Sequence, residues 1–213
     1  KIQKLTVNGA DTVITPSIYF KNLVSKWVKN PEKVFCIYNG INLNDLYSED
    51  NNFEIRTLIS AGRLVPWKGF HMLIKIMKNL PEWKLKIAGD GPIKKELIEY
   101  AKLEGVSDRV TFLGQIKREE LIKLLKKSEL FVLNTSFESF SFQIVEAMAA
   151  GVPVITTDIG NLSEIVENGK SGILIEPNNE SEIIQAIKKL SENHDLRKSI
   201  IMNAKERAKL FSI

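Results

Sequence analysis

Two glutamates in a single apolar stretch are the residues whose types and spacing first suggest chemistry. Glu138 and Glu146 stand eight positions apart in FESFSFQIVEAMAAGVPVI, residues 137–155, where almost every other residue is apolar or small. Carboxylates are rarely buried without a partner, so a pair in such a stretch indicates a ligand. Each carboxylate oxygen can accept one hydrogen bond from a vicinal hydroxyl, which predicts a sugar near one glutamate and a ribose near the other. The alternative is that both glutamates lie on the surface.

The residues between the two glutamates predict a phosphate site. We expect a strand over LFVLNT, residues 130–135, and then a helix whose N-terminus is formed by Ser139 to Phe142. The free backbone amides and the dipole at a helix N-terminus favour phosphate. Glu146 follows Ser139 by seven residues and so returns to the same helical face two turns along. This spacing suits a nucleoside diphosphate with one end near Glu138 and the other beside Glu146.

A loop earlier in the chain supplies two cations. SAGRLVPWKG places Arg63 and Lys68 directly after an expected strand at 57–62. A guanidinium fork and the point charge of a lysine could together neutralise a pyrophosphate. The alternative, that these are surface charges in a loop, has equal support from this loop alone.

Two further strand ends are candidates for ligand contact. In IAGDGP, Gly89 and Gly91 would let the backbone approach a ligand closely, although the same composition also suits a plain turn. In FLGQI, backbone groups of Gln115 and Ile116 could face a nucleobase.

The elements that must position these loops alternate regularly from Thr57 onward. Short apolar runs predict strands at 57–62, 83–89, 109–114, 130–135, 152–157 and 171–175. Amphipathic stretches predict helices at 69–80, 92–104, 118–128, 142–150, 180–191 and 195–209. Strands that alternate with helices of this length indicate an α/β fold, a doubly wound, Rossmann-like parallel sheet covered on both faces. Its ligand should lie at the carboxyl ends of the strands.

The first 45 residues fit this repeat less well. ADTVITPS predicts a strand, 18–29 a helix, and KVFCIYNG a second strand that ends in an Asn-Gly turn. A piece of this size cannot bury a core alone. We therefore expect residues 1–40 to be the tail of a preceding domain plus a linker, with a hinge near Asn39 and Gly40, and residues 41–213 to form the Rossmann-like domain. Because the chain starts and stops within regular structure, we expect it to be a fragment.

Composition excludes several classes of protein. With 44% hydrophobic and 26% charged residues, the chain matches a globular protein and neither a disordered nor a fibrous one. No apolar run reaches the roughly 18 residues of a membrane span. The single cysteine, Cys36, is interpreted as a small core residue. With one cysteine and only two histidines, the sequence argues against a zinc site. The net charge of +4 is compatible with an acidic membrane surface or a phosphorylated ligand.

Taken together, five motifs resemble one enzyme family along nearly the whole chain. NGIN, GRLVPWKG, IAGDGP, VTFLG and ESFSFQIVEAMAAGVPVI resemble the retaining glycosyltransferases of family four, which have the GT-B architecture. In that family two Rossmann-like domains face each other across a cleft, and the C-terminal domain binds a nucleotide-sugar donor while the N-terminal domain binds the acceptor. NGADTVITPS is similar to the last strand-helix unit of the N-terminal domain, and YNGINL to the linker.

The resemblance implies a role for each candidate residue. Arg63 and Lys68 would hold the donor pyrophosphate and stabilise the leaving nucleotide, and Glu138 would contact the donor sugar, so these three are the expected catalytic set. Glu146 would bind the ribose. The remaining expected donor-binding residues are Gly62, Gly89, Asp90, Gly91, Gln115, Ile116, Ser139, Phe140, Ser141 and Phe142.

One departure from the family concerns the residues after the first glutamate. The family usually has glycines where this chain has Ser139 and Ser141. If either position needs a positive φ, serine costs on the order of 1 kcal/mol. Its hydroxyl could instead cap the helix or reach the ligand.

The function expected from the resemblance is retaining transfer of a sugar to a glycan, lipid-linked or small-molecule acceptor. No Asp-X-Asp metal motif occurs, and neither a metal nor another cofactor is expected. The acceptor would be bound by the N-terminal domain, the fragment alone would be inactive, and no nucleic-acid partner is expected. The expected location is the cytoplasm, with the inner face of the membrane as a site of peripheral association.

Other functions are weaker alternatives. A non-catalytic nucleotide- or sugar-binding Rossmann module would bind without transfer, and the set of Arg63, Lys68, Glu138 and Glu146 argues against it. The two-glutamate spacing disfavours a GT-B epimerase or an inverting transferase. A dinucleotide dehydrogenase is disfavoured because no G-x-G-x-x-G follows the first strand of the repeat.

Overall fold

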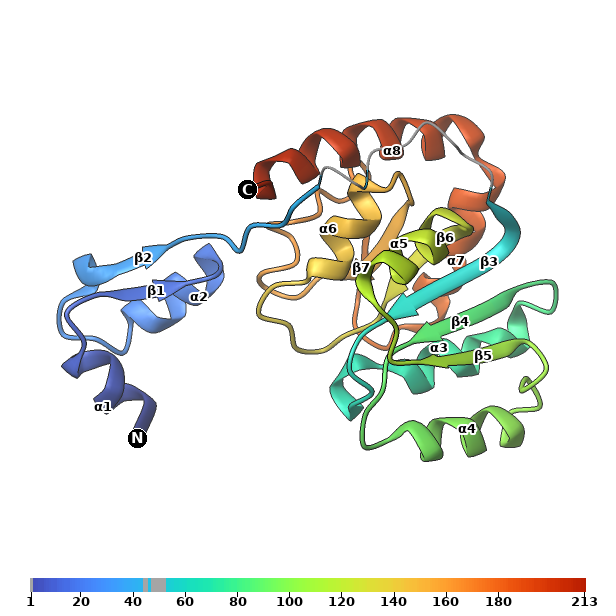
Figure 1. Ribbon diagram of the computed structural model, residues 1–213, viewed down its shortest axis with the longest axis horizontal. Helices are drawn as coiled ribbons and strands as arrows, with labels where there is room; N and C mark the ends of the chain where they lie inside the picture. The colour runs from blue at the N-terminus through green and yellow to red at the C-terminus, as the bar shows by residue number, and fades with distance from the viewer. Residues whose placement is uncertain (1, 44–45, 47–52) are drawn as a thin grey trace.

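The protein has a small N-terminal piece and a larger α/β part joined by an extended linker (Figure 1). The structure is a computed structural model, and it describes residues 2–43, 46 and 53–213. In the larger part, six parallel strands form one sheet with helices on both faces, as the sequence predicts.

The sheet has its topological switch point at its centre. The strands are β3 (Glu54–Ala61), β4 (Lys84–Ala88), β5 (Val110–Gly114), β6 (Ser128–Leu133), β7 (Val154–Thr157) and β8 (Ile173–Ile175), in the order β5-β4-β3-β6-β7-β8. All neighbouring pairs are parallel. The chain first adds β4 and β5 on one side of β3, and then adds β6, β7 and β8 on the other side. The loops that follow β3 and β6 therefore lead in opposite directions. A crevice for a ligand forms at the carboxyl ends of such strands.

The helices follow the predicted spans, with small differences at their ends. They are α3 (Phe70–Lys75), α4 (Lys94–Leu103), α5 (Arg118–Lys126), α6 (Phe142–Ala149), α7 (Glu180–Glu192) and α8 (His194–Ala208). The helix predicted at 69–80 divides into α3 and a 3-10 segment, Ile76–Asn79. Asn179 and Asn193 cap α7 and α8 through their side chains, which fixes where these two helices begin.

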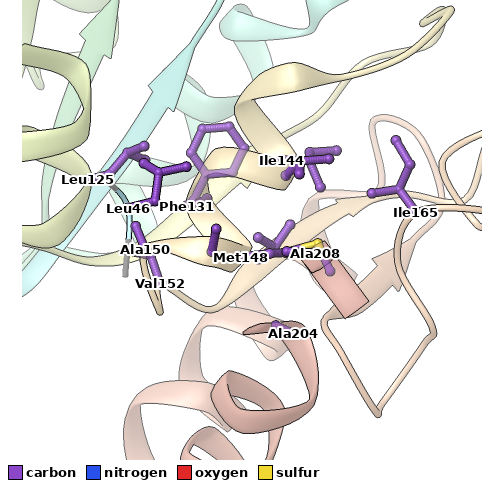
Figure 2. Close-up of a cluster of buried hydrophobic side chains, with 14 of the residues drawn as sticks. Leu46, Leu125, Phe131, Ile144, Met148, Ala150, Val152, Ile165, Ala204 and Ala208 are labelled. Atoms are coloured by element: carbon purple, nitrogen blue, oxygen red, sulfur yellow. The ribbon is translucent and has the colours of Figure 1, made fainter. Parts of the chain in front are cut away.

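Two apolar layers lie on opposite faces of the sheet because neighbouring strand residues point to opposite sides. In β6, Phe131 and Leu133 face α5, α6 and α8, whereas Leu130 and Val132 face the layer of α3, α4 and α7. Figure 2 shows the first layer, in which Met148 of α6 lies between the sheet and Ala204 and Ala208 of α8. Buried strands read as continuous apolar runs for this reason.

The N-terminal piece contains α1 (Ile2–Gly9), β1 (Val13–Thr15), α2 (Ile18–Ser25), the 3-10 turn Pro31–Lys33 and β2 (Val34–Cys36). Strands β1 and β2 pair in parallel as a separate two-stranded sheet. The sequence did not predict α1, and α2 ends earlier than the predicted 29. The prediction that Cys36 is a core residue is wrong, because the side chain is half-buried and its neighbours Phe35 and Ile37 are exposed.

The linker contacts the last turn of the chain. The Ile41 amide donates to the Phe211 carbonyl at 2.8 Å, and Ile41 forms an isolated parallel bridge with Ser212. Within the described residues, no helix combines the length and the apolar character needed to cross a membrane.

Candidate functional site

A pocket of about 370 Å³ lies at the carboxyl ends of β3, β4 and β5. Its wall brings together six residues that the sequence predicted as donor-binding or catalytic: Gly62, Arg63, Gly89, Asp90, Gln115 and Ile116. Ala61, Ala88, Leu121 and Gln143 complete it, and these four were not predicted. Three strand ends and the first turn of α6 therefore converge on one cavity.

Glycines in this wall let the strand ends approach one another. Gly89 has φ +136°, and a Cβ there would lie 1.9 Å from the carbonyl oxygen of Gly62. At Gly91 a Cβ would lie 2.3 Å from the carbonyl oxygen of Leu64. Close packing against Gly62 and Leu64 explains why glycine stands at both positions, so a nearby ligand is not needed as the explanation. Only Gly89 of the two lines the pocket.

The two charged residues on the pocket wall, Arg63 and Asp90, differ in whether they have partners. The Arg63 side chain is exposed and, within the described residues, forms no ion pair or hydrogen bond. Asp90 is already engaged, because its carboxylate accepts from Lys94 Nζ and from the Gly91 amide, each at 2.7 Å. These contacts, that of Lys94 first, lower the pKa of Asp90. The guanidinium of Arg63 is thus a charge on this wall that no carboxylate offsets, which suits an anionic ligand.

The loop after β3 is docked onto the loop after β6. The carbonyl of Trp67 accepts from the Ser136 amide at 2.8 Å and from the Thr135 hydroxyl at 3.1 Å. This contact carries the next residue, Lys68, to Glu138, and their side chains form a hydrogen-bonded ion pair. Each side chain is only 12% exposed. The sequence predicted both residues for the site but assigned them to different parts of the ligand, and their mutual pairing was not predicted.

The N-terminus of α6 has backbone amides without a partner in the described part of the chain, but Phe140 and Ser141 are buried, and none of the predicted residues 139–142 lines the pocket. Ser141 caps it by accepting from the Ile144 amide at 3.4 Å. Among the described residues, no hydrogen bond occupies the amides of Phe140, Ser141 or Phe142. Ser139 and Ser141 carry no left-handed strain, since the non-glycine residues with positive φ in the described part are Arg56 and Asn178. Ser141 therefore keeps its amide unpaired among the described residues and adds a cap, whereas the Ser139 amide donates to the Glu138 carboxylate at 3.2 Å.

Glu146 is buried, so the surface alternative for this residue is wrong. It is 4% exposed, and its carboxylate accepts from Arg118 Nε at 2.7 Å. Burial raises the pKa of Glu146, and the hydrogen bond and charge of Arg118 oppose that rise. Gln143 and Leu121, each one turn away from a member of this pair, line the pocket, so the Glu146–Arg118 pair adjoins it.

Sequence reasoning missed Arg118, and a signal for it existed. Arg118 is the first residue of α5, where the helix dipole disfavours a cation, and Glu119 and Glu120 follow it. A basic residue at that unfavourable position indicates a partner elsewhere. Arg118 has two, because it also donates to the Asn42 carbonyl in the linker at 2.8 Å.

Residues 47–207 match the family described as Glycosyl transferases group 1. The chain belongs to this family. Among curated relatives of this family member, an uncharacterised glycosyltransferase of Methanocaldococcus jannaschii is 34% identical over 98% of the chain and 58% of its own length. An N-acetylgalactosamine-N,N'-diacetylbacillosaminyl-diphospho-undecaprenol 4-alpha-N-acetylgalactosaminyltransferase of Campylobacter jejuni is 31% identical, over 90% of the chain and 53% of its own length. The chain thus spans a little over half the length of these relatives.

Solved structures also match this chain closely. Anabaena HepE, in a complex with UDP-glucose, has a TM-score of 0.88 and 26% identity over 96% of the chain and 61% of its own. Sucrose-phosphate synthase of Thermosynechococcus elongatus has a TM-score of 0.90 and 25% identity over 99% of the chain and 56% of its own. Both support the GT-B, Rossmann-like architecture predicted from the sequence.

Within the described part of the chain, no group of three or more histidine, cysteine, aspartate or glutamate side chains could hold a metal ion. The expectation of metal-independent chemistry stays a prediction.

Proposed function

We propose that this chain is the donor-binding part of a retaining glycosyltransferase of family four. Its donor is a nucleoside diphosphate sugar, and its acceptor is a glycan or a lipid-linked saccharide. The observation that carries the proposal is the pocket at the carboxyl edge of the sheet, whose wall combines Arg63, which has no ion-pair partner among the described residues, with Gln143 in the first turn of α6.

The chemistry needs positive charge where the leaving group develops negative charge. Breaking the bond between the sugar and the phosphate leaves a cationic sugar and an anionic diphosphate. Arg63, Lys68 and the amides at the start of α6 would stabilise that anion, as preorganised donors do in other enzymes. Lys68 would take on this role by exchanging its Glu138 partner for a phosphate oxygen, which frees the Glu138 carboxylate for the sugar hydroxyls. The proposed reaction uses no metal.

The donor base and the acceptor are proposed from the relatives. Because Anabaena HepE binds UDP-glucose, we propose uridine as the donor base. The name of the Campylobacter jejuni relative describes an undecaprenol-linked saccharide, which supports a lipid-linked acceptor. Since the chain spans little more than half of these relatives, we propose that it binds the donor but needs further residues for transfer.

Calorimetry with nucleoside diphosphates tests this proposal. We expect the chain to bind UDP more tightly than uridine. Arg63→Ala should weaken UDP binding by about 1.5–3 kcal/mol while changing uridine binding little, because its partner is the diphosphate. The control is Lys189→Ala on α7, an exposed cation outside the pocket wall.

Equal losses for UDP and uridine would remove Arg63 from the phosphate site. If UDP, GDP and ADP all fail to bind, the proposed function is wrong. If they bind, and a longer protein that includes this chain transfers no sugar, the alternative of a non-catalytic nucleotide-binding module is favoured.

A further inference from the structure

A second cavity, of about 100 Å³, lies between α2 and the loops that follow β6 and β7. Tyr19, Phe20 and Leu23 of α2 form one wall, and the opposite wall includes Phe137, Glu138 and Asn161. It is separate from the pocket that holds Arg63, but it shares Glu138 with the Lys68 pair. A group bound here would lie next to the proposed reacting centre.

Asn161 carries a hydrogen-bond donor that lacks a partner. The residue is 3% exposed, and its Nδ2 atom forms no hydrogen bond within the described residues. A buried donor left unsatisfied costs free energy, and such groups often mark a place that another molecule fills. Asn161 lines the cavity, so an oxygen acceptor that reaches Nδ2 from the cavity would satisfy this amide.

The other walls define what kind of group fits. Phe20 and Phe137 meet edge to face with ring centroids 6.4 Å apart, and Leu23 adds an apolar surface. The Glu138 carboxylate, on the same cavity, is an acceptor without a proton to donate. The cavity therefore suits a small uncharged group with one oxygen acceptor, one N–H donor and a methyl end. An acetamido group has all three.

The two walls of the cavity are held together by Glu164. Its carboxylate accepts from the backbone amides of Ile18 at 2.7 Å and Tyr19 at 2.6 Å, at the start of α2, and from the Tyr38 hydroxyl at 2.9 Å. The ring of Tyr19 also packs so closely on Gly160 that a Cβ there would lie 2.5 Å from it. The cavity is thus formed before any ligand arrives.

We propose that this cavity recognises the acetamido group of an N-acetylated sugar, with Asn161 donating to its carbonyl and the methyl group among the aromatic rings. Asn161 is then a residue that determines which sugar is accepted. The inference deepens the proposed function and rests on it. The sugar can be the transferred one or that of the acceptor, because the cavity shares Glu138 with the proposed reacting centre, where the two sugars would meet.

A matched pair of donors tests the first source. UDP-N-acetylglucosamine and UDP-glucose differ only in an acetamido group in place of a hydroxyl. By calorimetry we expect the wild-type chain to bind UDP-N-acetylglucosamine about tenfold more tightly, and Asn161→Ala to bind the two equally.

A second arm tests the acceptor as the source. With UDP saturating, methyl N-acetylglucosaminide and methyl glucoside are titrated and followed by NMR. A preference of about tenfold for the N-acetylated glycoside, lost in Asn161→Ala, assigns the cavity to the acceptor.

The melting temperatures of the Asn161 variants show whether they are correctly folded. Asn161→Ala and the similarly sized Asn161→Leu remove an amide that has no partner, so the melting temperature of the unliganded chain should stay the same or rise. Asn203→Ala on α8 should keep the wild-type preference.

The proposal is overturned if neither arm shows a preference, or if Asn161→Ala retains it. It is also overturned if both Asn161 variants melt well below wild type, because the amide would then be structural. A chain that binds UDP without any acetamido preference leaves the proposed function standing and rejects only this inference. A chain that binds no nucleotide rejects the function itself.

Discussion

Glu146 and Arg118 show how a single ion pair can keep a carboxylate inside an apolar layer. Of the two side chains, that of Glu146 is 6% exposed and that of Arg118 is 37% exposed, so the guanidinium stays partly in water while the carboxylate does not. Arg118 supplies the partner that Glu146 needs and also holds the linker through Asn42. A proposed ribose contact by Glu146 would add to this pair rather than replace it.

Removing Arg118 should therefore make the unfolding free energy strongly dependent on pH. Burial already raises the pKa of Glu146, and loss of Arg118 raises it further. A carboxyl with a raised pKa in the folded state stabilises the fold most below its unfolded pKa of about 4.3, and this stability is lost as the pH rises through the folded value. We expect Arg118→Leu to lose about 1–3 kcal/mol at pH 7, and clearly less at pH 4.5.

Urea unfolding at several pH values measures this effect. The double variant Arg118→Leu with Glu146→Gln should recover most of the loss at pH 7, since no charge is then buried. A loss that is the same at pH 4.5 and pH 7 would show that Arg118 acts through packing alone.

Individual elements were predictable where the apolar pattern has a clear period. The six strands of the larger part follow from short apolar runs and its helices from three-and-four spacing, and in the structure Asn179 and Asn193 cap two of these helices. The predicted strand ends also placed Arg63 and Gln115 correctly in one pocket.

What the sequence could not predict depends on contacts between elements distant in the chain. The Lys68–Glu138 pair requires the Trp67 carbonyl to dock on the loop after β6, and nothing in either segment alone encodes that contact. The cavity at Asn161 requires α2, which is more than a hundred residues away, to lie against the loop after β7. Such contacts are set by the packing of whole elements.

The close approach of β3 and β4 at the pocket floor gives a test at the scale of the element. Gly89→Ala places a Cβ 1.9 Å from the Gly62 carbonyl and also meets φ +136°. Gly105→Ala is the reference for a positive φ in open space, because its φ is +69° and no atom lies within 4 Å of the new Cβ. We expect about 1 kcal/mol of destabilisation for Gly105→Ala and at least twice that for Gly89→Ala.

Chemical denaturation of both variants measures the difference. Equal losses would mean that strain, and not contact between the strand ends, explains the glycine at position 89.

At the scale of the whole molecule, one carboxylate joins the N-terminal piece to the sheet domain. Glu164 lies in the loop region after β7, yet it accepts hydrogen bonds from two amides of α2 and from Tyr38 in the linker. The linker itself is held by Tyr38, whose ring packs edge to face on Phe211 at 5.5 Å. The relative placement of the two parts thus depends strongly on Glu164.

Replacing Glu164 should loosen the two parts without harming the pocket. In Glu164→Ala we expect the amides of Ile18 and Tyr19 to exchange hydrogen at least tenfold faster, because they lose their acceptor. UDP binding should stay at the wild-type value, since the Arg63 pocket contains no residue of the N-terminal piece.

Hydrogen exchange read by NMR measures the change at each amide. Glu206→Ala, which removes an exposed carboxylate paired with Lys209, serves as the control. Unchanged exchange at Ile18 and Tyr19 would show that α2 is held by its apolar contacts alone.

In the proposed reaction, the pairing of Lys68 with Glu138 would also impose an order of binding on the site. While the two side chains neutralise each other, a free sugar meets a carboxylate that is already engaged, and a neutral sugar cannot displace the ammonium. A diphosphate can, because it offers the ammonium a stronger partner. Only after the phosphate has bound Lys68 would the Glu138 carboxylate be available to the sugar hydroxyls. Free sugars, which carry no phosphate, would therefore not compete for the site. When the nucleoside diphosphate leaves, the Lys68–Glu138 pair would form again, and no free sugar would bind to Glu138.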